Sequence, residues 1–239
     1  MRGLLLSDLH LEYASMPADA GGADFVVLAG DIAIGTAGVE WAKAFGVPTF
    51  YVPGNHEFDD GALGLIEDMR RVADGSHVRI LDDEVALHGH VRIIGSTLWS
   101  DFALFGGNVD ADDHRPVDDQ AFDNYELTKP ALLARHRRSV RYIQEMLEVP
   151  FSGQTLVATH FAPSARSIPE RFAEDPRSAF LASNLDMLVR DSGAVIWHHG
   201  HVHDTRMYFI GETKVIANPR GTPGEDCNPA FDPRFMIDI

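Results

Sequence analysis

Cysteine is almost absent from this chain, which has one, Cys227, in 239 residues. A single cysteine forms no disulfide within the chain and supplies no set of thiolates for a structural zinc or iron–sulfur site. This composition is typical of a cytoplasmic protein. Cys227 itself is interpreted as a loop thiol without a role.

Long hydrophobic runs are also missing. The longest are of strand length, so no segment is predicted to span a membrane. The apolar run Leu4–Leu6 near the N-terminus is too short for a secretory signal. The apolar fraction of 45% is nevertheless ordinary for a folded protein. Without a repeat, a low-complexity tract or a linker, residues 1–239 are expected to form one domain.

Basic residues are scarce: 20 Lys and Arg stand against 36 Asp and Glu, for a formal net charge of −16. Such a charge repels nucleic acids and anionic membranes at long range, so neither is expected as a partner. Part of the excess lies between residues 101 and 126, which hold eight acidic residues and one basic one. Residues 102–126 are interpreted as an acidic insertion that lies beside the functional site or, alternatively, forms a remote solvated loop.

Short apolar runs rich in β-branched and aromatic residues predict strands, and amphipathic segments between them predict helices. The first strands alternate with helices, which favours a parallel sheet. The runs at 78–81, 84–88 and 91–94 are separated by two-residue turns and predict an antiparallel meander. The other predicted strands are 2–7, 25–29, 49–52, 155–159, 194–197, 205–210, 214–217 and 235–239, and the helices are 38–45, 61–73, 130–147 and 180–189.

Five of these strands end in a carboxylate, an amide or an imidazole. Such groups are costly to bury unpaired, and the carboxyl ends of strands share one edge of an α/β sheet, where ligands bind. Asp8 and His10 are two residues apart, so both side chains can reach one ion. Nitrogen and oxygen donors without sulfur suit manganese, iron, zinc or cobalt. The candidate residues are Asp8, His10, Asp31, Asn55, His56, His160, His201 and His203.

Their order along the chain resembles a known family. Asp8-Leu9-His10, Gly30-Asp31, Gly54-Asn55-His56-Glu57, His160 and Gly200-His201-Val202-His203 are similar to the five ordered motifs of calcineurin-like metallophosphoesterases, from residue 7 to about residue 221. The resemblance implies an α/β (α+β) fold, a four-layer αββα sandwich with two mixed β-sheets. It also implies two divalent metal ions, one held by Asp8, His10, Asp31 and His203, and one by Asp31, Asn55, His160 and His201.

The resemblance implies a reaction as well. Two divalent ions about 3.5–4 Å apart activate a water molecule, and the resulting hydroxide attacks phosphorus. His56, the family's non-ligand histidine, would stabilise charge or protonate the leaving oxygen, with Glu57, Asp59 or Asp60 as its partner. Substrate contacts are expected from Asn55, His56, Arg166 and Arg220, although a surface role is the simpler interpretation of both arginines. The long loop from Phe161 to Pro176 is a further functional candidate.

The expected function is therefore metal-dependent hydrolysis of a small phosphodiester or an activated phosphoester. Related protein phosphatases carry an arginine shortly after the bridging aspartate, where this chain has Ile34 and Gly35. Without that fixed cation, a diester is easier to neutralise than a monoester, which carries one more charge. The alternatives are a catalytically weak metal-binding scaffold of the same fold, a nuclease and a phosphomonoesterase.

Overall fold

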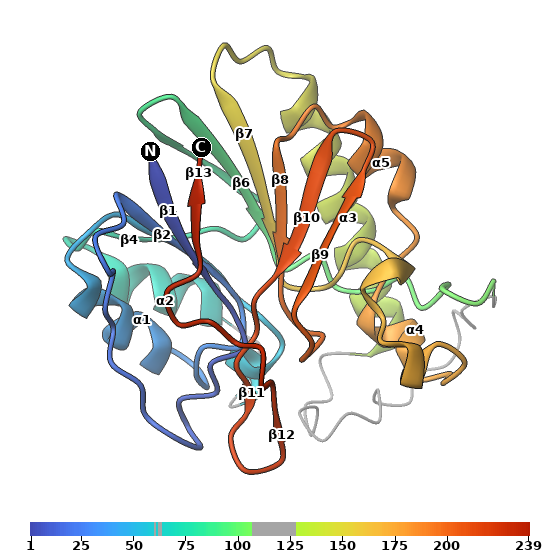
Figure 1. Ribbon diagram of the computed structural model, residues 1–239, viewed down its shortest axis with the longest axis horizontal. Coiled ribbons are helices and arrows are strands. Elements are labelled where there is room, and N and C mark those ends of the chain that lie inside the picture. The colour runs from blue at the N-terminus through green and yellow to red at the C-terminus, as the bar shows by residue number, and fades with distance from the viewer. Residues whose placement is uncertain (60, 62–63, 107–127) are drawn as a thin grey trace.

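In the computed structural model, two β-sheets pack face to face and helices cover both outer surfaces (Figure 1). Helices α1 (Ala37–Ala42) and α2 (Leu65–Ala73) lie outside the first sheet, and α3 (Lys129–Glu148) and α5 (Asp186–Asp191) lie outside the second. This arrangement confirms the predicted α/β fold class with two mixed sheets. The structure describes residues 1–59, 61, 64–106 and 128–239.

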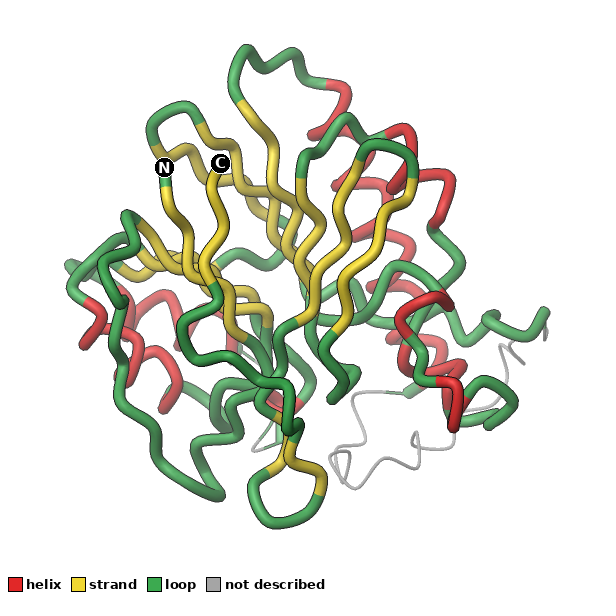
Figure 2. The backbone as a smooth tube through the Cα atoms, in the orientation of Figure 1, coloured by secondary structure: helices red, strands yellow, loops and turns green. Residues whose placement is uncertain are grey.

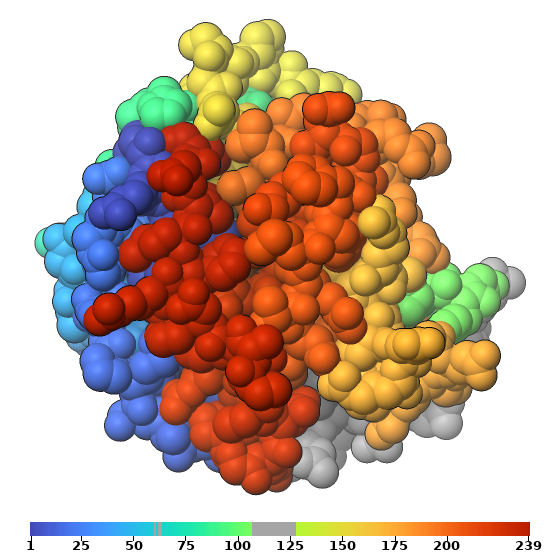
Figure 3. Space-filling model, viewed as in Figure 1, coloured from blue at the N-terminus to red at the C-terminus, as the bar shows by residue number. Residues whose placement is uncertain are grey.

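The first sheet has the strand order β13-β1-β2-β3-β4. Its strands β1 to β4 are parallel, whereas β13 pairs antiparallel to β1 and places Asp238 opposite Arg2. The C-terminal strand therefore closes the edge on which the chain begins, and Figure 3 shows the C-terminal residues crossing the face of the molecule beside the N-terminal part. The strands are β1 (Arg2–Leu6), β2 (Phe25–Ala29), β3 (Thr49–Val52), β4 (Val78–Ile80) and β13 (Met236–Asp238).

The second sheet has the order β5-β6-β7-β8-β10-β9. Four central strands are parallel, and β5 and β9 pair antiparallel at the edges. A separate two-stranded sheet, β11 (Gly221–Thr222) with β12 (Asp226–Cys227), projects below the main sheets in Figure 1. The six strands are β5 (Glu84–His88), β6 (Val91–Ser96), β7 (Gln154–Thr159), β8 (Ile196–His199), β9 (Arg206–Ile210) and β10 (Thr213–Ala217).

Two sequence predictions are wrong in detail. Of the three strands in the predicted meander, only β5 and β6 pair antiparallel, because β4 joins the first sheet parallel to β3. The expected turn at Asp82-Asp83 instead crosses between the sheets. The helix predicted over 180–189 is two helices, α4 (Ser178–Leu181) and α5. Between them the backbone of Ser183 and Leu185 donates hydrogen bonds to the carbonyls of Ala162 and Pro163, so a continuous helix is replaced by pairing with a neighbouring loop.

Successive side chains along each strand point to opposite faces of its sheet, and this alternation builds the layers of the core. In β1, Leu5 faces the other sheet, whereas Leu4 and Leu6 face the helices. The layer between the sheets contains Val27, Phe50 and Val52 from the first sheet, and Ile93, Leu156, Ala158 and Ile216 from the second. All of these are buried, and such contacts supply most of the driving force for folding. This shared layer fixes the position of one sheet relative to the other, and with it the positions of the loops at the strand ends.

Loops gather below the main sheets in Figure 2, where the carboxyl ends of the parallel strands meet. Most of the predicted acidic insertion at 102–126 lies outside the described residues. None of the helices in the described part of the chain is both long enough and apolar enough to cross a membrane.

Candidate functional site

The candidate residues lie just beyond the carboxyl ends of β1, β2, β3, β7 and β8. Backbone hydrogen bonds join these loops to one another, from Asp8 N to Gly30 O (2.9 Å) and from His10 N to Asp31 O (3.1 Å). Asp8, His10, Asp31 and His201 have positive φ angles of 49°, 46°, 54° and 65°. Non-glycine residues adopt this conformation at a cost that the surrounding structure must offset, and such residues cluster at functional sites.

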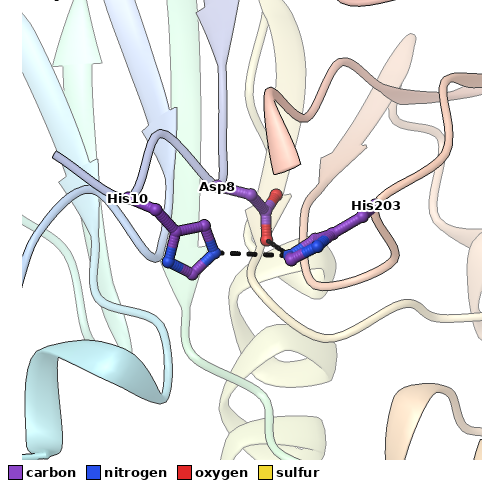
Figure 4. Close-up of side chains that lie close together, drawn as sticks. All are labelled: Asp8, His10 and His203. Carbon is purple, nitrogen blue, oxygen red and sulfur yellow. Dashed lines mark hydrogen bonds and ion pairs between the residues drawn. The ribbon is translucent and has the colours of Figure 1, made fainter. Parts of the chain in front are cut away.

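A first group consists of Asp8, His10 and His203 (Figure 4). His10 Nε2 lies 3.3 Å from His203 Nε2, which lies 3.6 Å from Asp8 Oδ1. Asp8 is fully buried, and its Oδ2 has no hydrogen-bond partner among the described residues. Two imidazole nitrogens and a carboxylate that converge in this way are placed to share one cation.

A second group consists of Asp31, His160 and His201. His160 Nε2 lies 3.2 Å from Asp31 Oδ2 and 2.8 Å from Asn55 Oδ1, so Asn55 belongs to the same cluster. His201 Nε2 is buried and has no hydrogen-bond partner in the described structure. A buried, unpaired nitrogen is costly unless another ligand satisfies it.

Asp31 connects the two groups, because it also forms a group with His10 and His56. Its pKa lies well below the usual range of an aspartate. Burial raises this pKa, but the neighbouring charges of His160 and His56 lower it, and the lowering is the larger effect. Burial has the opposite effect on a histidine and lowers the pKa of His201. At His160 burial also lowers the pKa, but the charge of Asp31 and its hydrogen bond with the ring contribute to a net rise to about 9. The cluster therefore holds an ionised carboxylate at its centre.

The remote nitrogens of three histidines are held by oxygen atoms. His160 Nδ1 lies 2.8 Å from Ala29 O, His10 Nδ1 lies 3.0 Å from Glu12 Oε1, and His203 Nδ1 lies 3.4 Å from Asp226 Oδ2. Such partners orient metal-binding histidines and leave the other nitrogen available. Together with the two unpaired buried atoms, these contacts show that the residues present fit divalent cations.

His56 begins a short 3₁₀ helix, His56–Phe58, and its side chain is 24% exposed. Its Nδ1 lies 3.0 Å from Asp59 Oδ2, and its Nε2 lies 4.0 Å from Asp31 Oδ2. Asp59, one of the three partners considered from the sequence, therefore contacts the ring. Asp60 lies outside the described residues, and the Glu57 carboxylate bonds to the backbone of Asp31 and Gly54 instead.

Glu57 has a different position, which the sequence did not reveal. It is fully buried, and its Oε2 accepts hydrogen bonds from Asp31 N (3.0 Å) and Gly54 N (2.6 Å). Its Oε1 accepts from Ile32 N (2.8 Å) and Tyr51 Oη (2.7 Å). One carboxylate thus fixes the turns after β2 and β3, which carry Asp31 and Asn55. Burial raises the pKa of Glu57, and the charge of Asp31 raises it further.

Close backbone approach also shapes this centre. A Cβ atom at Gly30, whose φ is +84°, would collide with the ring of His160, and one at Gly54 would collide with Asp31 Oδ1. Glycine at both positions therefore lets the strand ends approach the candidate ligands closely.

The structure does not bring Arg166 and Arg220 to the site. The Arg166 guanidinium lies over the Tyr208 ring and donates to Phe209 O at 2.7 Å. Arg220 donates to Leu9 O (3.0 Å) and Ala14 O (2.7 Å) and supports the loop after β1. Neither lines the pocket described below, so the geometry favours the simpler, structural interpretation for both arginines.

A pocket of about 260 Å³ opens beside the cluster. Asp31, Asn55, His56, His201 and His203 line it, together with Arg171, Phe172 and Asp204. The last three were missed in the sequence, although Arg171 and Phe172 belong to the long loop that was a functional candidate. The signal that could have pointed to them was a cationic side chain next to an aromatic one, Arg171-Phe172, within that loop. Asp204, the hydrogen-bond partner of Arg171, is distant along the chain, and only the fold brings the two together.

Two mixed sheets with clusters of Asp and His at their strand ends define an α/β protein able to bind metal ions. Residues 1–205 match the calcineurin-like phosphoesterase family, and the chain belongs to that family of metal-dependent hydrolases. No curated relative matches the chain in sequence.

Solved structures show the same fold. Phosphopantetheinyl hydrolase from Mycobacterium tuberculosis is 19% identical with a TM-score of 0.66, over 92% of this chain and 89% of that one. The protein TT1561 of Thermus thermophilus is 15% identical with a TM-score of 0.56, over 91% and 88%. Plasmodium GAP50, described as the anchor in the inner membrane complex, is 12% identical with a TM-score of 0.50, over 99% and 77%. Such identities establish the fold and leave the function to the site.

Proposed function

We propose that this protein hydrolyses small phosphodiesters with the help of two divalent metal ions. The observation that carries the proposal is the pair of donor groups Asp8–His10–His203 and Asp31–His160–His201, which a third group of His10, Asp31 and His56 connects. Asp8 Oδ2 and His201 Nε2 are buried in them without a hydrogen-bond partner among the described residues. One ion would be held by Asp8, His10, Asp31 and His203, and the other by Asp31, Asn55, His160 and His201. Manganese, iron, zinc and cobalt all suit these donors.

When bound, two such ions lower the pKa of a water molecule and neutralise charge on the phosphoryl group. The chain supplies the geometry. Asp31 is held by Glu57 through its backbone and accepts a hydrogen bond from His56 N at 2.9 Å through Oδ1. Its position is therefore fixed before any ligand arrives, which is how a preorganised site avoids reorganisation during the reaction.

His56 supplies the proton. Asp59 holds Nδ1, so the ring is oriented and Nε2 faces the cluster. A proton on Nε2 stabilises a phosphoryl oxygen or passes to the departing alkoxide. Partial exposure of the side chain lets a substrate reach it.

Two features support a small diester as substrate. The pocket volume of about 260 Å³ is at the lower end for small-molecule sites. No arginine stands where related protein phosphatases carry one after the bridging aspartate, since those positions are Ile34 and Gly35 here. The net charge of −16 argues against a nuclease, and the single cysteine supports a cytoplasmic location.

The test compares matched aryl substrates, 4-nitrophenyl phosphate and bis(4-nitrophenyl) phosphate, with the manganese-loaded protein. We expect a higher kcat/KM for the diester. A tenfold or greater preference for the monoester would overturn the diester assignment and leave the hydrolase assignment intact.

A non-catalytic scaffold of the same fold is the competing proposal. The complete donor set and a histidine oriented by Asp59 support turnover, since a scaffold needs neither. Binding of two ions without hydrolysis of any phosphoester in a broad screen would favour the scaffold.

A further inference from the structure

Arg171 occupies a position in the pocket that the proposed chemistry does not use. It lies in the 3₁₀ helix Glu170–Phe172 and is the one lysine or arginine among the described residues that line the pocket. Its side chain is 50% exposed. A cation that shares a pocket with a phosphoryl site is placed to contact another part of the same substrate.

The guanidinium is held in place but not saturated. It donates to both carboxylate oxygens of Asp204, at 3.0 and 2.5 Å, and lies 4.7 Å from the centroid of the Phe172 ring. A guanidinium has five N–H donors, and the described residues take two of them. Three donors remain on a group whose orientation is already fixed, which lowers the entropic cost of binding a ligand.

We propose that Arg171 binds a second oxyanion of the substrate, a carboxylate or phosphate group on an alcohol arm of the phosphodiester. This inference rests on the proposed hydrolase function and specifies its substrate class. The aliphatic or aromatic part of that arm packs against Phe172 and Val202, which line the same pocket. A planar oxyanion accepts parallel hydrogen bonds from a guanidinium, a geometry that lysine does not offer.

Asp204 acts against this selectivity while it orients Arg171. Its carboxylate neutralises the guanidinium and repels a second anion, so its removal strengthens the preference for charged substrates. Arg171 and Asp204 variants therefore shift one ratio in opposite directions. A salt bridge that only secured the loop to the turn after His203 would not do so.

The experiment uses the full-length manganese-loaded protein and two diesters that release the same 4-nitrophenolate. One carries a 4-carboxyphenyl group on its second arm, and the other carries the neutral 4-carbamoylphenyl group. The measured quantity is the ratio of kcat/KM for the charged diester to that for the neutral one. A third diester with a phosphonate in place of the carboxylate ranks the two kinds of oxyanion.

We expect Arg171→Gln to lower this ratio about three- to tenfold, a range set by the partial exposure of the side chain. Asp204→Asn should raise the ratio, and Arg171→Lys should fall between wild type and Arg171→Gln. Arg177→Gln is the matched control, because Arg177 lies in the same segment and pairs with Asp175 but does not line the pocket.

The outcomes separate the two proposals. Turnover of both diesters with a ratio that Arg171→Gln leaves unchanged would refute the role of Arg171 and leave the hydrolase assignment standing. Lack of turnover of every diester would refute the diester assignment and the inference with it, and lack of turnover of 4-nitrophenyl phosphate as well would refute the hydrolase assignment. A fourth diester, with a cationic 4-(aminomethyl)phenyl arm, tests the opposite preference. A higher kcat/KM for it than for the carboxylate would refute the role of Arg171 and assign the pocket to Asp204 and Asp226.

Discussion

Replacement of Glu57 by glutamine should destabilise the protein although the two side chains have the same shape. The carboxylate accepts four hydrogen bonds, from the backbone of Asp31, Ile32 and Gly54 and from the hydroxyl of Tyr51. A glutamine has one acceptor oxygen. Its best orientation keeps that oxygen on Asp31 N and Gly54 N and turns its amide group toward Tyr51, whose hydroxyl reverses and accepts.

In that orientation Ile32 N loses its partner in a fully buried place, and the two retained bonds lose their charge assistance. One unsatisfied buried donor costs about 1–3 kcal/mol, so we expect a loss of about 2–3 kcal/mol in the free energy of unfolding. For a chain of this size the melting temperature should fall by roughly 4–12 °C. Tyr51→Phe removes one donor only and should cost about 1 kcal/mol.

The assay is urea denaturation of metal-free protein, in which the effect on the turns is separated from metal binding. Glu40→Gln is the control, because Glu40 is exposed on α1 and, within the described part of the chain, forms an ion pair only with Lys43, at 3.1 Å. It should change stability by less than about 0.5 kcal/mol. A Glu57→Gln variant as stable as this control would show that the turns after β2 and β3 do not depend on Glu57.

Three further predictions concern the site and its support. Asp31→Asn should abolish activity and reduce bound metal, measured by elemental analysis, more than His201→Ala does; two ions at full occupancy would contradict a bridging role. His56→Asn should keep metal content near normal but lower kcat by about 10² or more, with a smaller loss for Asp59→Asn; loss of both metals would instead make His56 a ligand. Burial lowers the pKa of His198 to about 4 from 6.5, so the unfolded chain protonates first and stability should fall as pH drops from 6.5 toward 4. Since one proton is worth about 1.4 kcal/mol per pH unit, urea midpoints of His198→Asn should depend less steeply on pH, and an unchanged slope would count against this assignment.

The sequence was sufficient for the parts of the fold that depend on local pattern. Strands such as Phe25–Ala29 and Thr49–Val52 were predicted with their observed bounds, because apolar β-branched runs end at glycine or proline there. The clustering of Asp8 and Asp31 followed from one rule, that parallel strands of a sheet bring their carboxyl ends to one edge. His160 follows a strand of the second sheet, and only the packing of the two sheets brings it to them. Whether these residues bind metal stays a prediction until metal content is measured.

What escaped prediction depends on contacts between distant segments. The pairing of β4 with β3 instead of β5 is a choice between two sheets, and the strand sequence Val78–Ile80 fits either. Arg166 and Arg171 are both arginines of the same long loop, so the sequence alone does not distinguish them. The path of the loop places Arg171 in the pocket and Arg166 against Phe209 O. Glu57 was visible as a motif residue, but its role depends on the simultaneous approach of Asp31 and Gly54.

The sharing of the site between the sheets makes metal uptake a reporter of how the protein assembles. Asp8, His10, Asp31 and Asn55 follow strands of the first sheet, whereas His160, His201 and His203 follow strands of the second. Each proposed ligand set draws on both, so neither is complete while the sheets are apart. Bound ions would then link the two sheets. Free metal should raise the free energy of unfolding by RT ln(1 + [M]/Kd) for each ion, and the unfolding midpoint with it. During refolding, high-affinity metal binding should appear only when the two sheets have docked.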